Sequence, residues 1–402
     1  MADFQAMHVI EALRSGVPSR AVGAYFSEAR PAMLKKLRSE MEAVQQSGKS
    51  RGMVFTGKYG EGKTHMLNTV FSMASESNMA VSYVSLGKET PMDKMHLLYP
   101  KLIANTYLPG KAQPGFRSLL EEMTEGSGVA GQLMAYAATS LETNKIYHLL
   151  EAFLGTQEEE ERAQFLADLE GDFVSSALIK KSFRRVTGKP AKLNQNFSKT
   201  KHYMDYFDFI SVLFRRAGLN GWVILFDEAE LLGRLGKKAR MKCYRNMQAF
   251  LNPGKELEGV FSLFAFSASF ADEVIDRRHE ISNVEENFAE DPAALKAARA
   301  TLNAVLDAPE LAPLSREEIL LVLSNIQEFH GLAYDWTPGV SPETLYANTE
   351  GGGYLLRTRI RAAIELLDQL YQYGEAGKIK LTALGQESLE EESDTPELPE
   401  DF

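Results

Sequence analysis

The sequence predicts an α/β fold built on a parallel β-sheet that carries a phosphate-binding loop. Three observations predict it. An apolar run at 51–57 leads into a glycine-rich loop with P-loop spacing, and a helix-like pattern follows to about residue 79. The run 80–86, rich in β-branched and aromatic residues, completes a strand, helix, strand unit. Two later apolar runs, 221–226 and 260–266, have the length of fully buried strands.

Helical patterns surround these strands. Residues 1–50 carry apolar residues at three- and four-residue spacing, with a break at 16–19. Helices are also expected at 315–330, where Ser315 opens a Ser-Arg-Glu-Glu start signal, and at 354–373. We therefore expect an N-terminal helical segment (1–50), an α/β core (51–100 and 206–310), a helical region (101–205), a C-terminal helical region (311–385) and an acidic tail without fixed structure (386–402).

The composition is that of a soluble globular protein. Of 402 residues, 44% are hydrophobic and 25% charged, which is enough apolar material for two or three packed units. Cys243 is the only cysteine, so an internal disulfide and a cysteine-based zinc site are excluded. Neither a signal-peptide core nor an apolar stretch of membrane-spanning length is found, so we expect a cytoplasmic protein.

The strongest functional pattern is the loop after the first strand. It reads Gly57, Lys58, Tyr59, Gly60, Glu61, Gly62, Lys63 and Thr64, followed by His65. Glycines let consecutive backbone N–H groups turn toward phosphates, and the positive end of the following helix dipole adds to the attraction. In this pattern Lys63 contacts the β and γ phosphates, and the Thr64 hydroxyl binds Mg²⁺. The loop predicts a site for ATP and Mg²⁺; a glycine-rich turn without nucleotide is the alternative.

Two acids, Asp227 and Glu228, end the third apolar run. An ionised pair at the end of a buried strand is costly unless a cation lies beside it. We expect Asp227 to hold Mg²⁺ through water or through Thr64, and Glu228 to orient and deprotonate the attacking water. A strand that runs into a solvated turn would leave the same pattern, so the functional interpretation depends on the loop.

Other polar residues are candidates for the same site. Ser267, with Ser269, ends the fourth strand, where a hydroxyl could contact the γ-phosphate or the attacking water. Arg277 or Arg278 could reach the ATP of a neighbouring subunit as an arginine finger. Arg357, Arg359 and Arg361 cannot all share one helix face, and we expect Arg357 to contact the nucleotide. A serine turn and solvated arginines are the alternatives.

Three stretches resemble a known family: Glu-Ala-Leu-Arg-Ser-Gly-Val-Pro-Ser-Arg at 11–20, the loop at 57–65, and Trp-Val-Ile-Leu-Phe-Asp-Glu-Ala-Glu-Leu-Leu-Gly-Arg-Leu-Gly at 222–236. They are similar to the BREX-type ATP-binding proteins of the BrxC/BrxD group, which belong to the AAA+ ATPases and are similar in layout to the origin-recognition initiators. The resemblance covers most of residues 8–375. It implies an ATPase of prokaryotic anti-phage defence that acts with nucleic-acid-handling partner proteins.

The same resemblance implies a C-terminal helical lid within 311–385 and sensor roles for the serines and arginines named above. The chain departs from the family in one respect. Far more residues separate Gly62 from Asp227 than a compact AAA+ module needs. The helical region at 101–205 is therefore expected to be an insertion between the strands that carry the site.

Basic residues concentrate in two segments, although the whole chain has a net charge of −11. Segment 179–202 has eight bases and no acid, including Lys180, Lys181, Arg184 and Arg185, and segment 234–245 has six, including Arg234, Lys237, Lys238 and Arg240. Such clusters suit a phosphate backbone, so DNA is an expected partner. Solvated helix faces are the alternative, and the acidic tail, with eight acids and no base, is a candidate intramolecular partner.

The expected function is a homo-oligomeric ATPase that couples hydrolysis to remodelling or loading on DNA, together with other defence-system proteins. The alternative is a nucleotide-gated scaffold that binds ATP and assembles partner proteins with little turnover. A protein unfoldase ranks last, because the sequence offers no convincing aromatic pore loop.

Overall fold

The computed structural model describes residues 3–15, 29–123, 128–254, 257–349 and 356–375. A five-stranded sheet forms its centre, in the order β1 (Arg51–Gly57), β5 (Val260–Ser267), β4 (Trp222–Asp227), β2 (Ala80–Ser85) and β3 (Thr106–Tyr107). Strands β1, β5, β4 and β2 are parallel, and β3 pairs with β2 in the antiparallel direction. The predicted α/β class with a parallel sheet is therefore confirmed.

Strand β3 is the element of this sheet that the sequence does not predict. It is two residues long, too short to leave an apolar pattern, and the buried hydroxyls of Thr106 and Ser82 join it to β2 at 2.6 Å. At the opposite edge of the sheet, Thr56 forms a parallel bridge with Glu310. The chain that leaves the core toward the C-terminal helices therefore lies beside β1.

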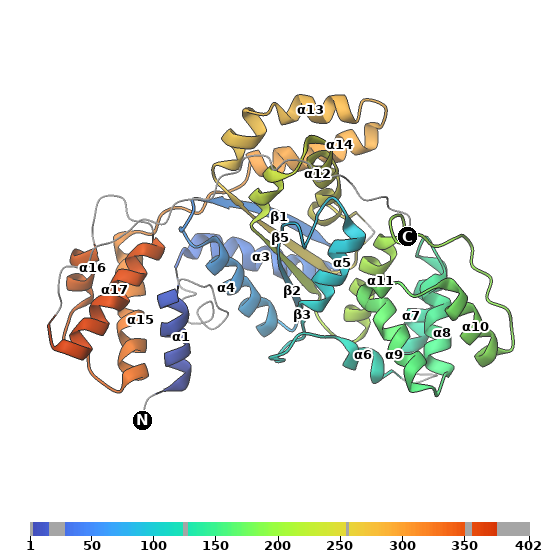
Figure 1. Ribbon diagram of the computed structural model, residues 1–402, viewed down its shortest axis with the longest axis horizontal. Helices are drawn as coiled ribbons and strands as arrows, with labels where there is room; N and C mark the ends of the chain where they lie inside the picture. The colour runs from blue at the N-terminus through green and yellow to red at the C-terminus, as the bar shows by residue number, and fades with distance from the viewer. Residues whose placement is uncertain (1–2, 16–28, 124–127, 255–256, 350–355, 376–402) are drawn as a thin grey trace.

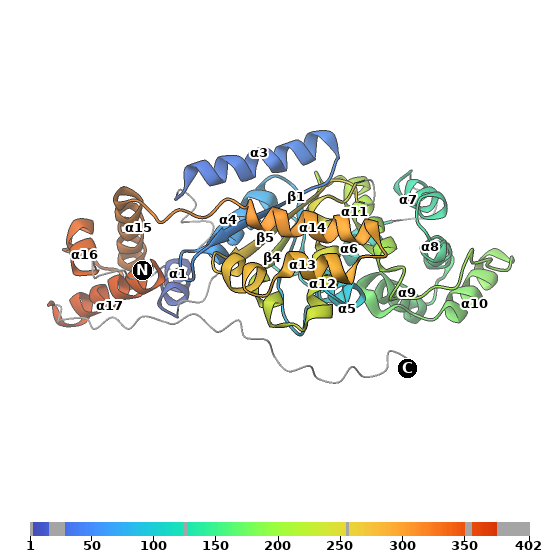
Figure 2. The ribbon, with the colours of Figure 1, turned by 90° about the horizontal axis from the view of Figure 1, so that it is seen from above.

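Helices cover both faces of the sheet, because alternate residues of each strand point to opposite sides. One face packs against α3 (Pro31–Ser47) and α4 (Lys63–Glu76). The other packs against α5 (Met95–Ala104), α11 (Tyr203–Arg216), α12 (Lys237–Leu251) and α14 (Pro292–Leu306). Figure 2 separates the two layers, with α3 on one side of the strands and α5 and α12 on the other.

Most of the chain between β2 and β4 is helical and lies to one side of the sheet (Figure 1). After α5 come α6 (Arg117–Glu121), α7 (Gly128–Thr139), α8 (Lys145–Gly155), α9 (Glu159–Ala167), the π-helical turn η1 (Asp168–Asp172), α10 (Ser176–Thr187) and α11. The apolar residues of α7 to α10 belong to the same hydrophobic cluster as the β4 face of the sheet. These helices are thus continuous with the core.

Short elements follow β4 and β5. They are the 3₁₀ turn η2 (Ala229–Arg234), the π-helical turn η3 (Ala271–Asp276) and α13 (Glu280–Asn287). Helix α13 packs against α12 and α14 at one end of the sheet (Figure 1).

The C-terminal helices form a second lobe with a core of its own (Figure 1). It contains α15 (Arg316–Tyr334), α16 (Pro342–Thr349) and α17 (Leu356–Tyr373), and also α1 (Phe4–Ser15) from the beginning of the chain. Helices α1 and α3, both within residues 1–50, therefore lie in different places, α3 on the sheet and α1 against α15 and α17. Ser315 and Glu318 form the capping box that the sequence signal indicates.

The acidic tail expected at 386–402 lies outside the described residues. Among the residues that are described, no helix combines the length and the apolar character needed to cross a membrane.

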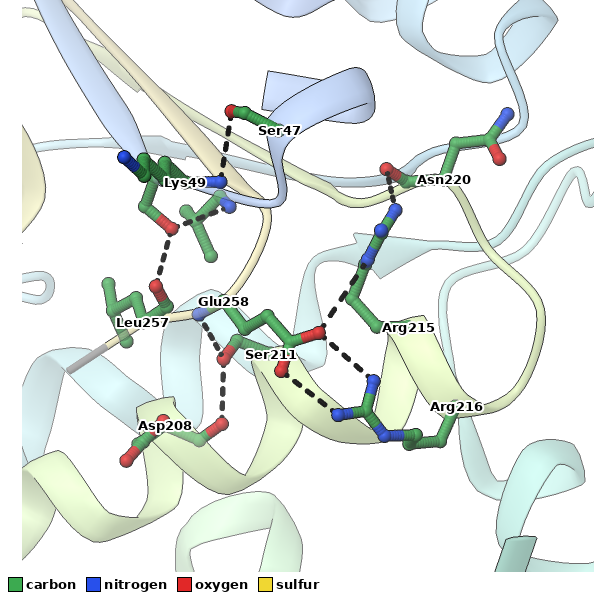
Figure 3. A network of polar contacts seen from close by, with 11 residues as sticks. Ser47, Lys49, Asp208, Ser211, Arg215, Arg216, Asn220, Leu257 and Glu258 are labelled. Atoms are coloured by element: carbon green, nitrogen blue, oxygen red, sulfur yellow. Dashed lines mark hydrogen bonds and ion pairs between the residues drawn. The ribbon is translucent and has the colours of Figure 1, made fainter. Parts of the chain in front are cut away.

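A polar network fixes the amino-terminal edge of the sheet (Figure 3). Glu258, just before β5, accepts hydrogen bonds from both terminal nitrogens of Arg216 at 3.0 and 3.2 Å, and its backbone N–H donates to the Ser211 hydroxyl at 3.0 Å. Both partners belong to α11. The backbone of Lys49, in the link from α3 to β1, forms an isolated antiparallel β-bridge with the backbone of Glu258. The network therefore joins α3, α11 and β5 at the edge opposite the carboxyl ends of the strands.

A buried ion pair lies among the helices between β2 and β4. The Lys145 ammonium donates to the Asp168 carboxylate at 2.7 Å and to the Tyr206 hydroxyl at 2.8 Å, and all three side chains are buried. Tyr206 in turn donates to Asp168 at 2.7 Å. Burial raises the pKa of Asp168 and lowers that of Lys145, while their mutual attraction opposes both shifts. The pair joins α8, η1 and α11.

Removing one partner of this pair is expected to destabilise the protein strongly. Lys145→Met leaves the Asp168 carboxylate buried without its cation, and the free energy of unfolding should fall by about 3–5 kcal/mol. Denaturant unfolding followed by circular dichroism measures the change. The double variant Lys145→Met/Asp168→Leu removes both charges of the pair and should recover much of the loss. A single variant as stable as wild type would show that the pair does not hold these helices.

Candidate nucleotide site

The candidate site is built on the carboxyl ends of three neighbouring strands. In the parallel register Gly57 at the end of β1 lies opposite Ser267 at the end of β5. Strand β4, on the other side of β5, ends at Asp227. The backbone N–H of Ala268 also donates to the Gly57 carbonyl at 3.1 Å. The loop, Ser267 and Asp227 are therefore brought to one edge of the sheet by the strand order alone.

The loop from Gly57 to Thr64 connects β1 directly to α4. Gly60 and Gly62 have φ of 77° and 92°, a left-handed conformation that favours glycine, and Gly62 is the N-cap residue directly before α4. At Gly57 an added Cβ would lie 3.2 Å from the Lys63 side chain. Thr64 and His65, both partly exposed, belong to the first turn of α4. The predicted strand, loop and helix order is found, with a helix N-terminus next to the loop.

Lys63 is held beneath the loop by two groups. Its side chain is 9% exposed, and its ammonium donates to the Gly57 carbonyl at 3.3 Å and lies 3.7 Å from the Glu230 carboxylate. The other oxygen of Glu230 accepts the backbone N–H of Ser267 at 3.0 Å. Burial raises the pKa of Glu230, and the Lys63 ammonium opposes that rise. The sequence interpretation missed Glu230, although it is a third acid that follows Asp227 and Glu228 closely, three residues after Asp227 in η2.

Asp227 is 3% exposed and is held in place by two donors. The hydroxyl of Tyr83, on β2, donates to one oxygen at 2.6 Å, and the backbone N–H of Glu228 donates to the other at 2.9 Å. Tyr83 is a second residue that the sequence interpretation missed, because only the pairing of β2 with β4 brings it near. The Glu228 side chain is exposed, and its backbone is left-handed with φ of 53°.

The donor set at this edge fits Mg²⁺. Mg²⁺ is commonly bound through one or two carboxylates and the phosphates of a substrate, with water completing its shell. Thr64 supplies a hydroxyl oxygen and Asp227 a buried carboxylate oxygen. The described residues contain no group of three or more His, Cys, Asp or Glu side chains that would form an all-protein metal cage.

The C-terminal lobe touches the loop through α17. The backbone N–H of Arg357 donates to the Gly60 carbonyl at 3.4 Å, and its guanidinium donates to the Tyr59 hydroxyl at 3.3 Å. Arg359 instead stacks over Tyr346 at 4.6 Å, and Arg361 is exposed. Of the three arginines considered, the structure therefore brings Arg357 to the loop.

Arg30 joins the loop to the C-terminal lobe from a third direction. It precedes α3 and is 8% exposed. Its guanidinium donates to the carbonyls of Glu61 at 2.6 Å and Ala312 at 2.9 Å, while its backbone N–H donates to Glu318 at 2.8 Å. One residue thus connects the loop, the segment before α15 and α15 itself. The sequence pattern gave no sign of this role.

The remaining candidates are the serines after β5 and two arginines that follow η3. Ser267 is 2% exposed, and its hydroxyl lies 3.1 Å from that of Ser269. Arg277 is exposed directly after η3. Arg278 donates to the Gly233 carbonyl at 2.6 Å.

The bases proposed to contact DNA differ in accessibility. On α10, Lys180, Lys181 and Arg184 are exposed. Lys238 on α12 is also exposed, and Arg234 is partly exposed. Two other bases form ion pairs, Arg185 with Glu158 and Glu161, and Lys237 with Glu286. The prediction for Arg240 is wrong. Its side chain is 3% exposed and pairs with the fully buried Glu280 at 3.0 Å, so it is not available to a phosphate.

Comparison with known families agrees with this geometry. The profile of the family described as BREX system ATP-binding protein BrxC/D matches residues 3–126 and 144–384. The chain belongs to the BrxC/D family. No similar protein was found among curated sequences.

The BrxC/D match spans nearly the whole chain, including the loop, all five strands and α15 to α17. The unmatched interval 127–143 contains α7. Membership makes the chain an ATP-binding protein of a BREX anti-phage system.

Arg30 is expected to stabilise the junction between the loop and the C-terminal lobe. Arg30→Met removes the donors to two carbonyls, and the free energy of unfolding should fall by about 1–3 kcal/mol. Denaturant unfolding measures this change. Arg38→Met makes the same substitution at an exposed arginine of α3 and should leave stability within about 0.5 kcal/mol of wild type. Equal losses in both variants would contradict the junction role.

Proposed function

We propose that this chain is an AAA+ ATPase that hydrolyses ATP and uses the energy to remodel or load other components on DNA. The observation that carries the proposal is the meeting of the P-loop with Asp227 and Glu228 at one edge of the sheet. This pairing of loop and acids is the arrangement that phosphoryl transfer to water requires. Membership in an ATP-binding family supplies the ligand.

Each group has a defined task in this proposal. Amides of the loop and the start of α4 bind the phosphates, and Lys63 donates to the β and γ oxygens. Glu228 accepts a proton from the attacking water, and its exposed side chain leaves room for that water. Mg²⁺, held by Thr64 and Asp227, would neutralise charge that develops on the phosphates.

The helical regions complete the proposal. Residues 101–205 act as an insertion in the ATPase core, and α15 to α17 act as a lid whose Arg357 senses the nucleotide from its position beside Tyr59. Ser267 is the matching sensor at the end of β5. Arg277 is accessible to a second copy of the chain, which fits a finger that completes a neighbouring ATP site in a homo-oligomer.

Substitutions at Lys63 and Glu228 are expected to separate binding from hydrolysis. Lys63→Ala should abolish binding of a fluorescent ATP analogue. Glu228→Gln should retain binding but lower the single-turnover hydrolysis rate by about 10²- to 10⁴-fold, because no group then accepts the proton of water. Equal rates for Glu228→Gln and wild type would remove Glu228 from catalysis.

A nucleotide-gated scaffold is the second candidate. The exposure of Glu228 favours it, because an exposed carboxylate is not confined within the buried part of the site. In that case wild type would bind ATP and change its assembly, measured by mass photometry, without turnover. The single-turnover rate of wild type thus decides between the two functions.

The proposed DNA contact rests on α10. Lys180, Lys181 and Arg184 lie on its exposed face, while Ile179 and Phe183 on the opposite face are buried. Three bases on one helix face suit contacts to a phosphate backbone, which carry no sequence information. Partner proteins of the same defence system would then act on the DNA that this chain engages.

Neutralising the α10 face should weaken DNA binding in a salt-dependent manner. Lys180→Gln/Lys181→Gln/Arg184→Gln should lower affinity and reduce the slope of log K against log salt by about 3, roughly one per lost phosphate contact. Fluorescence anisotropy across a salt series measures both quantities.

The control is Lys35→Gln/Lys36→Gln/Arg38→Gln on α3, which removes the same number and types of exposed bases from a different helix. It should leave the slope unchanged. Equal effects of the two triple variants would mean that only net charge matters and that α10 is not the contact.

A further inference from the structure

Glu230 is the one acid that the described contacts place against the P-loop lysine. Its carboxylate is 3.7 Å from the Lys63 ammonium, and the two side chains are only 13% and 9% exposed. Glu230 is not one of the paired acids at the end of β4, and the proposed hydrolysis of ATP gives it no task. Its position therefore calls for an explanation of its own.

A buried ammonium needs an opposite charge close by. In the structure Glu230 supplies that charge, with the Gly57 carbonyl as a second acceptor. The β and γ phosphates of ATP carry negative charge and, in a P-loop, are contacted by the same ammonium. An ammonium has three N–H donors, and the Gly57 carbonyl accepts one of them. If the β and γ phosphates take the other two, no donor is left for Glu230, so the phosphates and Glu230 compete for Lys63.

Glu230 also reaches the strand between the loop and Asp227. Its second oxygen accepts the Ser267 N–H at 3.0 Å at the carboxyl end of β5. One carboxylate thus connects the lysine of the P-loop to the strand that ends in the serines. Movement of Glu230 away from Lys63 would alter the hydrogen bonding of Ser267 as well.

We infer that Glu230 is a positioning residue that holds Lys63 in the nucleotide-free protein and is displaced from it by the phosphates of an incoming nucleotide. The inference rests on the proposed P-loop function. It makes the carboxylate an internal competitor that sets nucleotide affinity and reports occupancy of the loop to Ser267.

Glu230→Gln tests the inference, because the amide has nearly the same shape and can still accept the Ser267 N–H but carries no charge. Removing the competitor should lower the Kd for ATP and for ADP by about tenfold. AMP has no β or γ phosphate to compete for Lys63, so its Kd should not change. Isothermal titration calorimetry with the full chain measures all three.

Two controls keep the result specific. Glu89→Gln removes one exposed acid from the segment after β2 and should leave every Kd unchanged. Glu230→Ala removes the competitor and also the acceptor of Ser267, so it should tighten ATP and ADP binding while lowering the melting temperature. It carries the test if Glu230→Gln does not fold.

Unchanged or weaker ATP and ADP binding in a folded Glu230 variant would overturn the inference. Loss of hydrolysis at an unchanged Kd would also overturn it, because Glu230 would then be a catalytic residue. The readout is binding, so a wild-type protein that binds ATP but never hydrolyses it would contradict the proposed ATPase while leaving this inference intact.

Discussion

The parallel alignment of β1, β5 and β4 is the constraint on which the candidate site depends. Each strand ends at the same edge, so the loop, Ser267 and Asp227 meet although they are far apart in the sequence. A shift of one residue in the register of β4 would turn Asp227 to the other face of the sheet. At the opposite edge, the contacts of Glu258 with α11 and with Lys49 join the start of β5 to the helix that precedes β4 (Figure 3).

The parts of the fold that depend on local sequence could be predicted from the sequence. The strands around the site are short continuous apolar runs, the loop is a fixed pattern of glycines with Lys63, and Ser315 with Glu318 is a local cap. Each signal lies within a few residues of the element that it specifies. Family resemblance in three such stretches also agreed with the family found by the profile match.

The parts that depend on contacts between distant residues could not be predicted in this way. Tyr83 contacts Asp227 only because β2 pairs with β4. Arg30 forms hydrogen bonds with Ala312 and Glu318, which lie more than 280 residues later in the sequence. A run of bases predicts a charged surface, yet Arg240 is buried because Glu280 lies beside it. Charge counted along a sequence does not show which charges are paired in space.

The C-terminal lobe contains helices from both ends of the chain, and this affects the order in which the protein folds during synthesis. Helix α1 precedes the sheet in the sequence, but the helices that bury Val9 and Ile10 follow it. During synthesis the sheet can form while the apolar face of α1 is still exposed, because α15 and α17 have not yet been made. The contact of Arg357 with Tyr59 is then among the last to form. A chain that is cut short before α17 would keep its P-loop but leave α1 and α15 without one of the helices that bury their apolar faces, a state that chaperones and proteases recognise.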